Sequence, residues 1–257
     1  MNASSKVRLG DREVARTGLG TNRLTNTPEQ VAFLREAVAV GLGLIDTAHL
    51  YTGGQSEETI GEARSSFSDS VVIATKGGYS PGEGRPDVLR AQIEESMRRL
   101  RTDTIELYYP HRVDPETPLE ASVGVLKEYM DSGQIRHVGL SQVGVDQVAR
   151  ARDVVPITAV QNQYNLSERR FDDVVDYCAR EGIVFVPFFP LQGADGPAVA
   201  EIAERHGATQ GQIALAWLLH RSPAMLPIPG TLSLAHLKEN LDALEIELTE
   251  DEFEALA

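Results

Sequence analysis

The stretch that decides the fold is residues 105–141, IELYYPHRVDPETPLEASVGVLKEYMDSGQIRHVGLS. It begins with an apolar run at 105–109, continues into a helical pattern at 118–132 that Gly133 ends, and returns to an apolar run at 137–140. A short, mainly apolar run is typical of a strand buried on both faces, and a helix between two such strands is typical of a parallel pair. This stretch therefore predicts one β/α/β unit.

The same unit recurs along the chain. Residue types at the element ends agree with this pattern: Thr27 is placed to cap a helix whose first turn holds Pro28. The predicted strands lie at 17–19, 44–45, 71–74, 105–109, 137–140, 159–161, 184–187 and 225–228. The predicted helices lie at 28–41, 56–65, 86–101, 118–132, 146–155, 171–181, 198–206 and 233–241, with an additional helix at 209–220 and a terminal one that Thr249 caps.

Eight parallel strands, each followed by a helix, predict a (β/α)8 TIM barrel, an α/β fold of about 250 residues. An open doubly wound sheet is the alternative, but residues 18–22, GLGTN, contain Gly-x-Gly without the third glycine of its nucleotide-binding turn. Residues 7–16 predict an N-terminal β-hairpin with Gly10-Asp11 at its turn. No linker divides the chain, so we expect a single domain over residues 1–257 with short loops.

Composition and charge exclude several classes of protein. Of the 257 residues, 42% are hydrophobic, and 24 Lys+Arg stand against 38 Asp+Glu for a net charge of −14. A disordered chain would be less apolar, and a nucleic-acid binder would carry a basic stripe. No signal-peptide pattern and no apolar run of about 20 residues is present, so we expect a cytoplasmic protein without a membrane partner. Cys178 is the single cysteine, and we expect it to pack as a small buried residue.

Polar side chains stand where the predicted strands end, which is the active-site edge of a TIM barrel. The second strand is followed by Asp46 and, in the next loop, Tyr51; the third leads to Lys76 and the fourth to His111. A buried lysine needs a counter-charge, which Asp46 on the neighbouring strand can supply. We expect Lys76 to lower the pKa of Tyr51, and His111 to donate a hydrogen bond to the substrate oxygen. The four residues suit reduction of a carbonyl, in which negative charge develops on oxygen.

Two other barrel chemistries have less support in the sequence. Metal-dependent hydrolysis would need His and carboxylate ligands at short spacing, and the six histidines, at 49, 111, 137, 206, 220 and 236, contain no His-x-His pair. Phosphoryl transfer would need a Gly-x-x-x-x-Gly-Lys loop, which the chain lacks. We therefore expect no metal.

At these motifs the sequence resembles the aldo-keto reductase family, from the hairpin to the terminal helix. LIDTAHLY at 44–51 is similar to the family's Asp-Thr-Ala-x-x-Tyr segment, ATK at 74–76 to its lysine and LYYPH at 107–111 to its histidine. HVGLS at 137–141, VQNQYNL at 160–166, IPGT at 228–231 and HLKENL at 236–241 extend the resemblance. It implies a catalytic tetrad of Asp46, Tyr51, Lys76 and His111.

The resemblance further implies that the chain binds NADPH in an extended form and transfers hydride from the nicotinamide to an aldehyde or ketone. Ser141, Gln142 and Gln161 would contact the carboxamide, and Phe188 would stack on the ring. Gln142 stands where the family commonly has Asn. The other implied cofactor contacts are Gly20, Thr21, Asn22, Asp46, Phe189, Pro190, Leu191, Gly193, Ile228, Gly230, Thr231, Ser233, His236, Glu239 and Asn240.

The choice of coenzyme depends on the adenosine end of this site. Thr231 and Ser233 could bind a 2′-phosphate, or simply form a turn and a helix N-cap. Gly230 and His236 occupy positions where many relatives carry Lys and Arg, which bind phosphate more strongly. We expect NADP, with NAD as the possible alternative.

The substrate is less well defined by the sequence. VPFFPL at 186–191 and ALAWLLHRSPAMLPIPGT at 214–231 are most similar to bacterial NADPH-dependent reductases that include pyridoxal reductases, so pyridoxal is a candidate within the class of small carbonyl compounds. The short chain predicts an open, shallow pocket with broad specificity, unless a partner subunit covers it, and Asn22, Tyr79 and residues 192–196 are candidates for its wall. The alternative function is a non-enzymatic or redox-sensing NADPH-binding subunit resembling potassium-channel beta subunits. No pattern indicates an oligomeric state.

Overall fold

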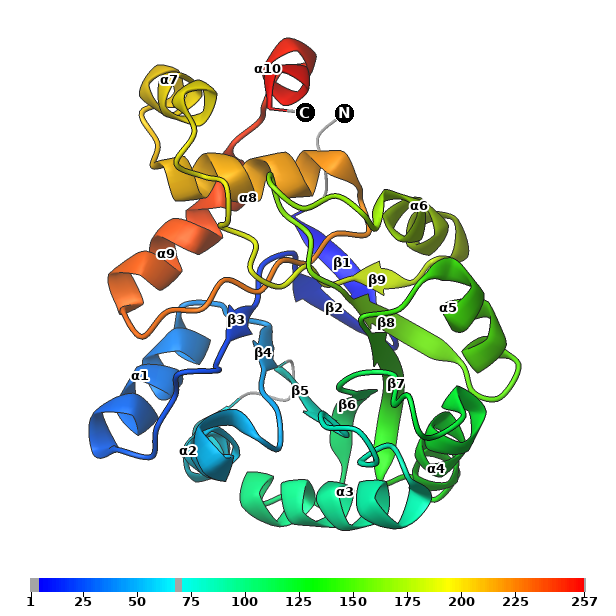
Figure 1. The fold of residues 1–257 in the computed structure, drawn as a ribbon. Helices are drawn as coiled ribbons and strands as arrows, with labels where there is room; N and C mark the ends of the chain where they lie inside the picture. Colours follow the sequence, from blue (N-terminus) through cyan, green and yellow to red (C-terminus); the bar gives the residue numbers. More distant parts are fainter. Residues whose placement is uncertain (1–4, 68–70, 257) are drawn as a thin grey trace.

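The computed structural model describes residues 5–67 and 71–256, and its centre is a ring of parallel strands surrounded by helices (Figure 1). The strands follow one another in chain order, each paired in parallel with the next. They are β3 (Leu19–Gly20), β4 (Leu44–Asp46), β5 (Val72–Gly77), β6 (Ile105–Pro110), β7 (Ile135–Ser141), β8 (Ile157–Gln161) and β9 (Val184–Phe185). The predicted α/β barrel is confirmed.

The predicted eighth strand, residues 225–228, closes the ring without forming a regular strand. Isolated bridges pair this closing segment with β9 on one side and, just beyond residue 228, with β3 on the other. The carbonyls of Pro227 and Pro229 accept hydrogen bonds from the N–H groups of Gly18 and Gly20 at 2.9 and 3.2 Å. The two prolines have no N–H to donate in return, so a full ladder cannot form. The prediction was right about the position of the segment and wrong about its regularity.

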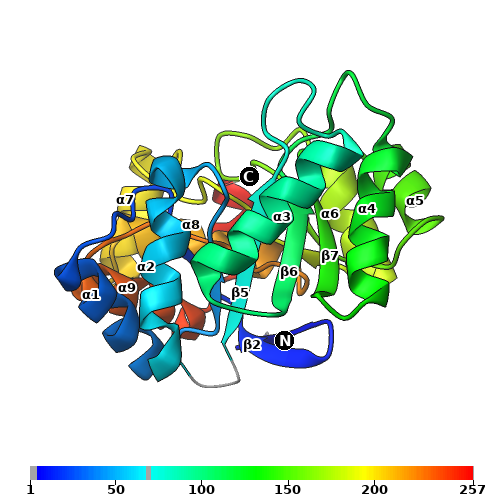
Figure 2. The ribbon, with the colours of Figure 1, turned by 90° about the horizontal axis from the view of Figure 1, so that it is seen from below.

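The helices cover the outside of the ring (Figures 1 and 2). The predicted caps at the first and last helices are present, since the hydroxyl of Thr27 accepts from the Gln30 N–H and that of Thr249 from the Glu252 N–H. The helices are α1 (Pro28–Ala39), α2 (Gln55–Ala63), α3 (Pro86–Leu100), α4 (Leu119–Asp131), α5 (Val145–Arg152), α6 (Asp172–Glu181), α7 (Pro197–His206), α8 (Gln210–Arg221), α9 (Leu234–Asp242) and α10 (Glu250–Ala255). The predicted additional helix before the closing segment is α8.

The N-terminal hairpin closes one end of the barrel. β1 (Lys6–Leu9) and β2 (Arg12–Ala15) pair antiparallel and lie across the ring in Figure 1 and below it in Figure 2. Asp11 at the hairpin turn accepts a hydrogen bond from His137, near the start of β7, at 2.8 Å. Leu9 and Val14 pack into the apolar interior of the barrel. Because the hairpin fills the end where the strands begin, a ligand can enter only where they finish.

A second and larger apolar core lies between the strands and the surrounding helices. Cys178 on α6 belongs to it and is fully buried, as predicted. Burial raises the pKa of its thiol to about 12, so the thiol stays protonated and unreactive at neutral pH. In the described part of the chain, none of the helices combines the length and apolar character needed to cross a membrane.

Candidate active site

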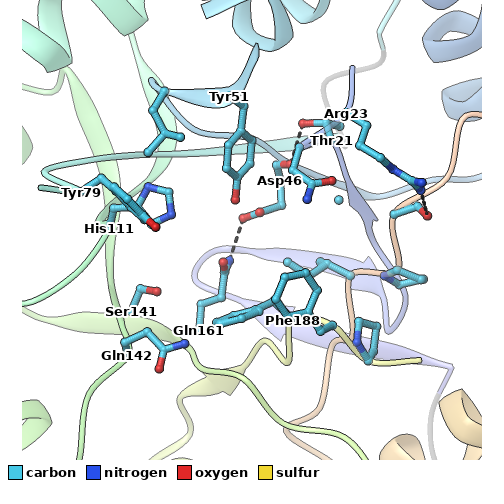
Figure 3. A pocket seen from close by; sticks show the side chains of 18 of the residues that line it. Thr21, Arg23, Asp46, Tyr51, Tyr79, His111, Ser141, Gln142, Gln161 and Phe188 are labelled. Carbon is cyan, nitrogen blue, oxygen red and sulfur yellow. Dashed lines mark hydrogen bonds between the residues drawn. The ribbon is translucent and has the colours of Figure 1, made fainter. Parts of the chain in front are cut away.

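A cavity of about 670 Å³ lies at the C-terminal ends of the strands (Figure 3). This is the size range of sites for small molecules and cofactors. Large apolar side chains at its mouth are 37–50% exposed, which is consistent with the open pocket expected from short loops. The lining consists of Gly20, Thr21, Asn22, Arg23, Asp46, Leu50, Tyr51, Tyr79, His111, Arg112, Ser141, Gln142, Gln161, Phe188, Phe189, Pro190, Leu191, Gln192, Ile228, Pro229 and Gly230.

Beneath the floor of the cavity, Lys76 forms a buried ion pair with Asp46. The Lys76 Nζ donates to Asp46 Oδ1 at 2.5 Å, to the Thr47 carbonyl at 2.7 Å and to the Tyr51 hydroxyl at 3.4 Å, so all three ammonium donors have partners. Asp46 Oδ2 accepts from Gln161 Nε2 at 2.7 Å. Burial lowers the pKa of Lys76, but the Asp46 carboxylate and the Tyr51 hydroxyl together outweigh it and the net pKa is raised, so the amine stays charged.

A sharp turn after β4 places Tyr51 above this ion pair. Tyr51 begins the short 3₁₀ turn η1 (Tyr51–Gly54), whose last residue has φ of +96°. This left-handed φ favours glycine at position 54, and a Cβ there would also displace the guanidinium of Arg99, which lies 2.4 Å from its place. The turn brings the Tyr51 ring over Lys76, with Nζ 5.0 Å from the ring centre.

The electrostatic effect on Tyr51 differs from the prediction. Burial raises the pKa of Tyr51, and this exceeds the lowering by the Lys76 ammonium, so the net pKa lies above the usual value near 10. The expected lowering was therefore wrong in its net direction, because the phenolate loses more hydration than the single cation restores. Tyr51 holds its proton firmly at neutral pH.

His111, at the end of β6, faces Tyr51 edge-on with ring centres 5.8 Å apart. Burial lowers the pKa of its imidazole to about 3, with the charges of Lys76 and Arg112 acting in the same direction. The ring is therefore neutral at pH 7 and carries one N–H to donate. Within the described residues, its buried Nδ1 has no hydrogen-bond partner.

The opposite wall of the cavity follows β7, β8 and β9. Gln142 donates its N–H to the Gln161 carbonyl at 3.0 Å and adopts φ of +57°, in the left-handed region. Asn tolerates this region better than Gln, so the backbone at Gln142 is in an unfavourable conformation. Phe189 has φ of +51°, and its ring meets that of Phe188 at 5.1 Å and 75°. Two strained backbone positions thus lie in the cavity wall.

Most of the residues predicted from the sequence meet in this cavity. Asp46, Tyr51 and His111 line it, and Lys76 contacts two of them from below. The predicted cofactor residues that also line it are Gly20, Thr21, Asn22, Ser141, Gln142, Gln161, Phe188, Phe189, Pro190, Leu191, Ile228 and Gly230. Those that do not are Gly193, Thr231, Ser233, His236, Glu239 and Asn240; apart from Gly193 they lie in α9 or the turn before it.

Sequence reasoning missed two arginines in the lining. Arg23 follows β3 and donates to the Gly230 carbonyl at 3.1 Å, and Arg112 directly follows His111. Figure 3 shows Arg23 at the opposite end of the cavity from His111. Arg112 directly follows the predicted strand-end residue His111, which was an available signal for it, whereas Arg23 lies four residues beyond the strand predicted at 17–19. In the described part of the chain, no group of three or more His, Cys, Asp or Glu side chains could hold a metal.

Comparison with protein-family models matches the Aldo/keto reductase family to residues 16–195 and 194–257, which together span most of the chain. The chain belongs to this family. The reductase is 36% identical over 274 residues to pyridoxine 4-dehydrogenase of Escherichia coli, a match that covers 97% of this chain and 96% of that protein. It is also 37% identical over 270 residues to an uncharacterized oxidoreductase of Schizosaccharomyces pombe, covering 97% and 88%.

Solved structures agree with this assignment. A thermostable aldo-keto reductase crystallised with the inhibitor epalrestat superimposes on the reductase with a TM-score of 0.89 at 33% identity, covering 98% of both chains. An aldo-keto reductase of Klebsiella pneumoniae in complex with NADPH gives a TM-score of 0.88 at 28% identity, covering 98% of this chain and 93% of that one. The predicted family and barrel fold are confirmed, and the protein is an oxidoreductase.

Proposed function

We propose that this reductase uses NADPH to reduce the carbonyl group of a small aldehyde or ketone to an alcohol, with Tyr51 as the proton donor. The observation that carries the proposal is the position of the Tyr51 hydroxyl. It lies 3.4 Å from the buried Lys76 ammonium and lines the cavity beside the neutral His111. A protonated phenol next to a fixed cation can act as a general acid.

The residues of the cavity fit NADP(H). Ser141 and Gln142 present polar groups at one wall, and the half-buried ring of Phe188 offers a flat apolar face for a nicotinamide. Arg23 provides a cation at the far end of the cavity for a phosphate group. The Gln161 side chain has fewer unused hydrogen-bond donors for the nicotinamide carboxamide than expected, because its Nε2 already donates to Asp46. The Klebsiella relative that binds NADPH supports this coenzyme.

The side chains divide the reaction between them. When bound, NADPH would be the source of the hydride that reduces the carbonyl carbon. As negative charge develops on the carbonyl oxygen, the Tyr51 hydroxyl gives its proton to that oxygen, and the Lys76 ammonium stabilises the phenolate left behind. His111 donates its N–H to the same oxygen, while Asp46 holds Lys76 in position through the 2.5 Å ion pair. A vitamin B6 aldehyde such as pyridoxal is the substrate that the E. coli relative suggests.

The test compares Tyr51→Phe with Tyr177→Phe, a matched variant on α6. We expect Tyr51→Phe to keep NADPH affinity, measured by fluorescence titration, and to lower kcat with pyridoxal or 4-nitrobenzaldehyde by about 10²–10⁴-fold. Tyr177→Phe should keep both. Full kcat in Tyr51→Phe would contradict the proton donor, and NADPH binding by the wild type without turnover of any aldehyde would favour the redox-sensing alternative.

A further inference from the structure

Among the described residues, an arginine next to the proposed catalytic residues has no acidic partner. Arg112 Nη2 donates to the Tyr79 hydroxyl at 2.9 Å, and the guanidinium lies 4.2 Å from the centre of the Tyr79 ring. Tyr79 in turn meets His111 edge-on at 5.0 Å. The Tyr79 ring therefore contacts both the Arg112 guanidinium and the His111 imidazole.

The residues that the structure describes around Arg112 include no carboxylate to neutralise it. Over residues 5–67 and 71–256, no Asp or Glu oxygen lies within ion-pair distance of Arg112, although the protein carries a net charge of −14. Asp46 is the single carboxylate in the described lining of the cavity, and Lys76 already neutralises it. Such an arginine at a cavity wall retains free donors for an anion.

A second cavity of about 460 Å³ adjoins the first at Arg112 and holds another arginine. The two cavities share Arg112, Gln142, Phe188 and Phe189, and the second one adds Arg170. Within the described residues, Arg170 has one carboxylate oxygen within ion-pair distance, that of Glu168 at 3.9 Å, which is a long contact. A substituent that extends from a carbonyl beside His111 would thus enter a space with cations on its walls.

The loops that carry Arg112 and Tyr79 are held together. The Asp114 carboxylate, two residues after Arg112, accepts from the N–H groups of Gly82 and Gly84, both at 2.9 Å. The carboxylate of Glu83 accepts from the Tyr79 N–H at 3.0 Å. These bonds fix the relative position of the guanidinium and the phenol ring, so little ordering is needed when a ligand binds.

We propose that Arg112 determines substrate specificity by binding an anionic group of the carbonyl substrate, a carboxylate or a phosphate ester, on the side of the site away from Arg23. The substrates selected in this way are aromatic or short aliphatic aldehydes that carry such a group. This inference rests on the proposed carbonyl reduction. A guanidinium forms two parallel hydrogen bonds with either anion, which an amide side chain cannot reproduce.

The test compares matched pairs of aldehydes on the NADPH-loaded enzyme. 4-Carboxybenzaldehyde is paired with methyl 4-formylbenzoate, and pyridoxal 5′-phosphate with pyridoxal, so the two pairs distinguish carboxylate from phosphate. We expect the ratio of kcat/KM, charged over neutral, to fall about tenfold in Arg112→Gln in at least one pair, and Arg112→Lys to restore part of it. Arg35→Gln, an equal loss of charge on the exposed face of α1, should leave the ratio unchanged.

A binding measurement separates this inference from the proposed function. The Kd of 4-(hydroxymethyl)benzoate for the NADP-loaded enzyme, measured by calorimetry, should rise about tenfold in Arg112→Gln. Reduction of the neutral aldehydes combined with an unchanged ratio and an unchanged Kd would overturn the role of Arg112 and leave the reductase activity standing. Absence of turnover of all four aldehydes would contradict the proposed function itself.

Discussion

The buried pair of Asp46 and Lys76 makes a quantitative prediction about stability. Lys76 is 0% exposed and Asp46 is 2% exposed, and the two atoms of the pair lie 2.5 Å apart. Replacing Lys76 by Met leaves an uncompensated carboxylate in the interior, and replacing Asp46 by Asn leaves an uncompensated ammonium. Breaking such a pair costs about 3–5 kcal/mol of unfolding free energy, which at about 2–4 °C per kcal/mol lowers Tm by about 6–20 °C.

The double variant Asp46→Asn, Lys76→Met removes both charges together. We expect the double variant to lose less unfolding free energy than the sum of the losses in the two single variants, by at least about 1 kcal/mol. The reason is that neither charge is then left without its partner. Lys127 and Asp131 provide a matched control on the surface of α4, since they form an ion pair at the same 2.5 Å with side chains 40% and 62% exposed. Breaking that pair should cost less than about 1 kcal/mol.

Urea unfolding followed by circular dichroism measures all of these variants under one condition. The reasoning would be refuted by single substitutions that cost no more than those in the surface pair. Additivity of Asp46→Asn and Lys76→Met within about 0.5 kcal/mol would also refute it, because contacting charges in a dry site must be coupled.

Two further predictions concern pH. Because the pKa of His111 is about 3 and that of Tyr51 is raised, kcat/KM for reduction should be flat between pH 6 and 9; a half-maximum near pH 6.5 that His111→Asn removes would contradict this. Burial raises the pKa of Asp114, but hydrogen bonds, including those from Gly82 and Gly84, lower it overall to about 2. Asp114→Asn should therefore destabilise the protein by about 2 kcal/mol at pH 7. A lowered acid pKa stabilises above the unfolded value near 4, so the difference should shrink as the pH falls from about 4 toward 2, and a difference in unfolding free energy that grows with acid would contradict the assignment.

Much of the site was predictable because a parallel barrel places all strand ends at one edge. Asp46, Lys76 and His111 each follow an apolar run, and that placement alone predicted that they lie together. Arg112 directly follows a strand-end residue, but both it and Arg23 were missed because a pattern of strands and helices does not show which loop side chains turn toward the centre. The irregular closing segment differs from the prediction for another reason: an apolar run indicates a strand, but Pro227 and Pro229 lack the N–H groups that a full ladder needs.

The sequence by itself determined the barrel, the order of its elements and the four residues proposed for proton transfer, because these follow from local periodicity and from the types of residue at strand ends. The tertiary structure alone decided the direction of the Tyr51 pKa, which depends on how much water the surrounding side chains exclude. It also decided that Arg112 has no acidic neighbour in the described chain and faces a second cavity. Desolvation and charge pairing depend on distances between segments far apart in the chain, and those distances exist only after the barrel has closed.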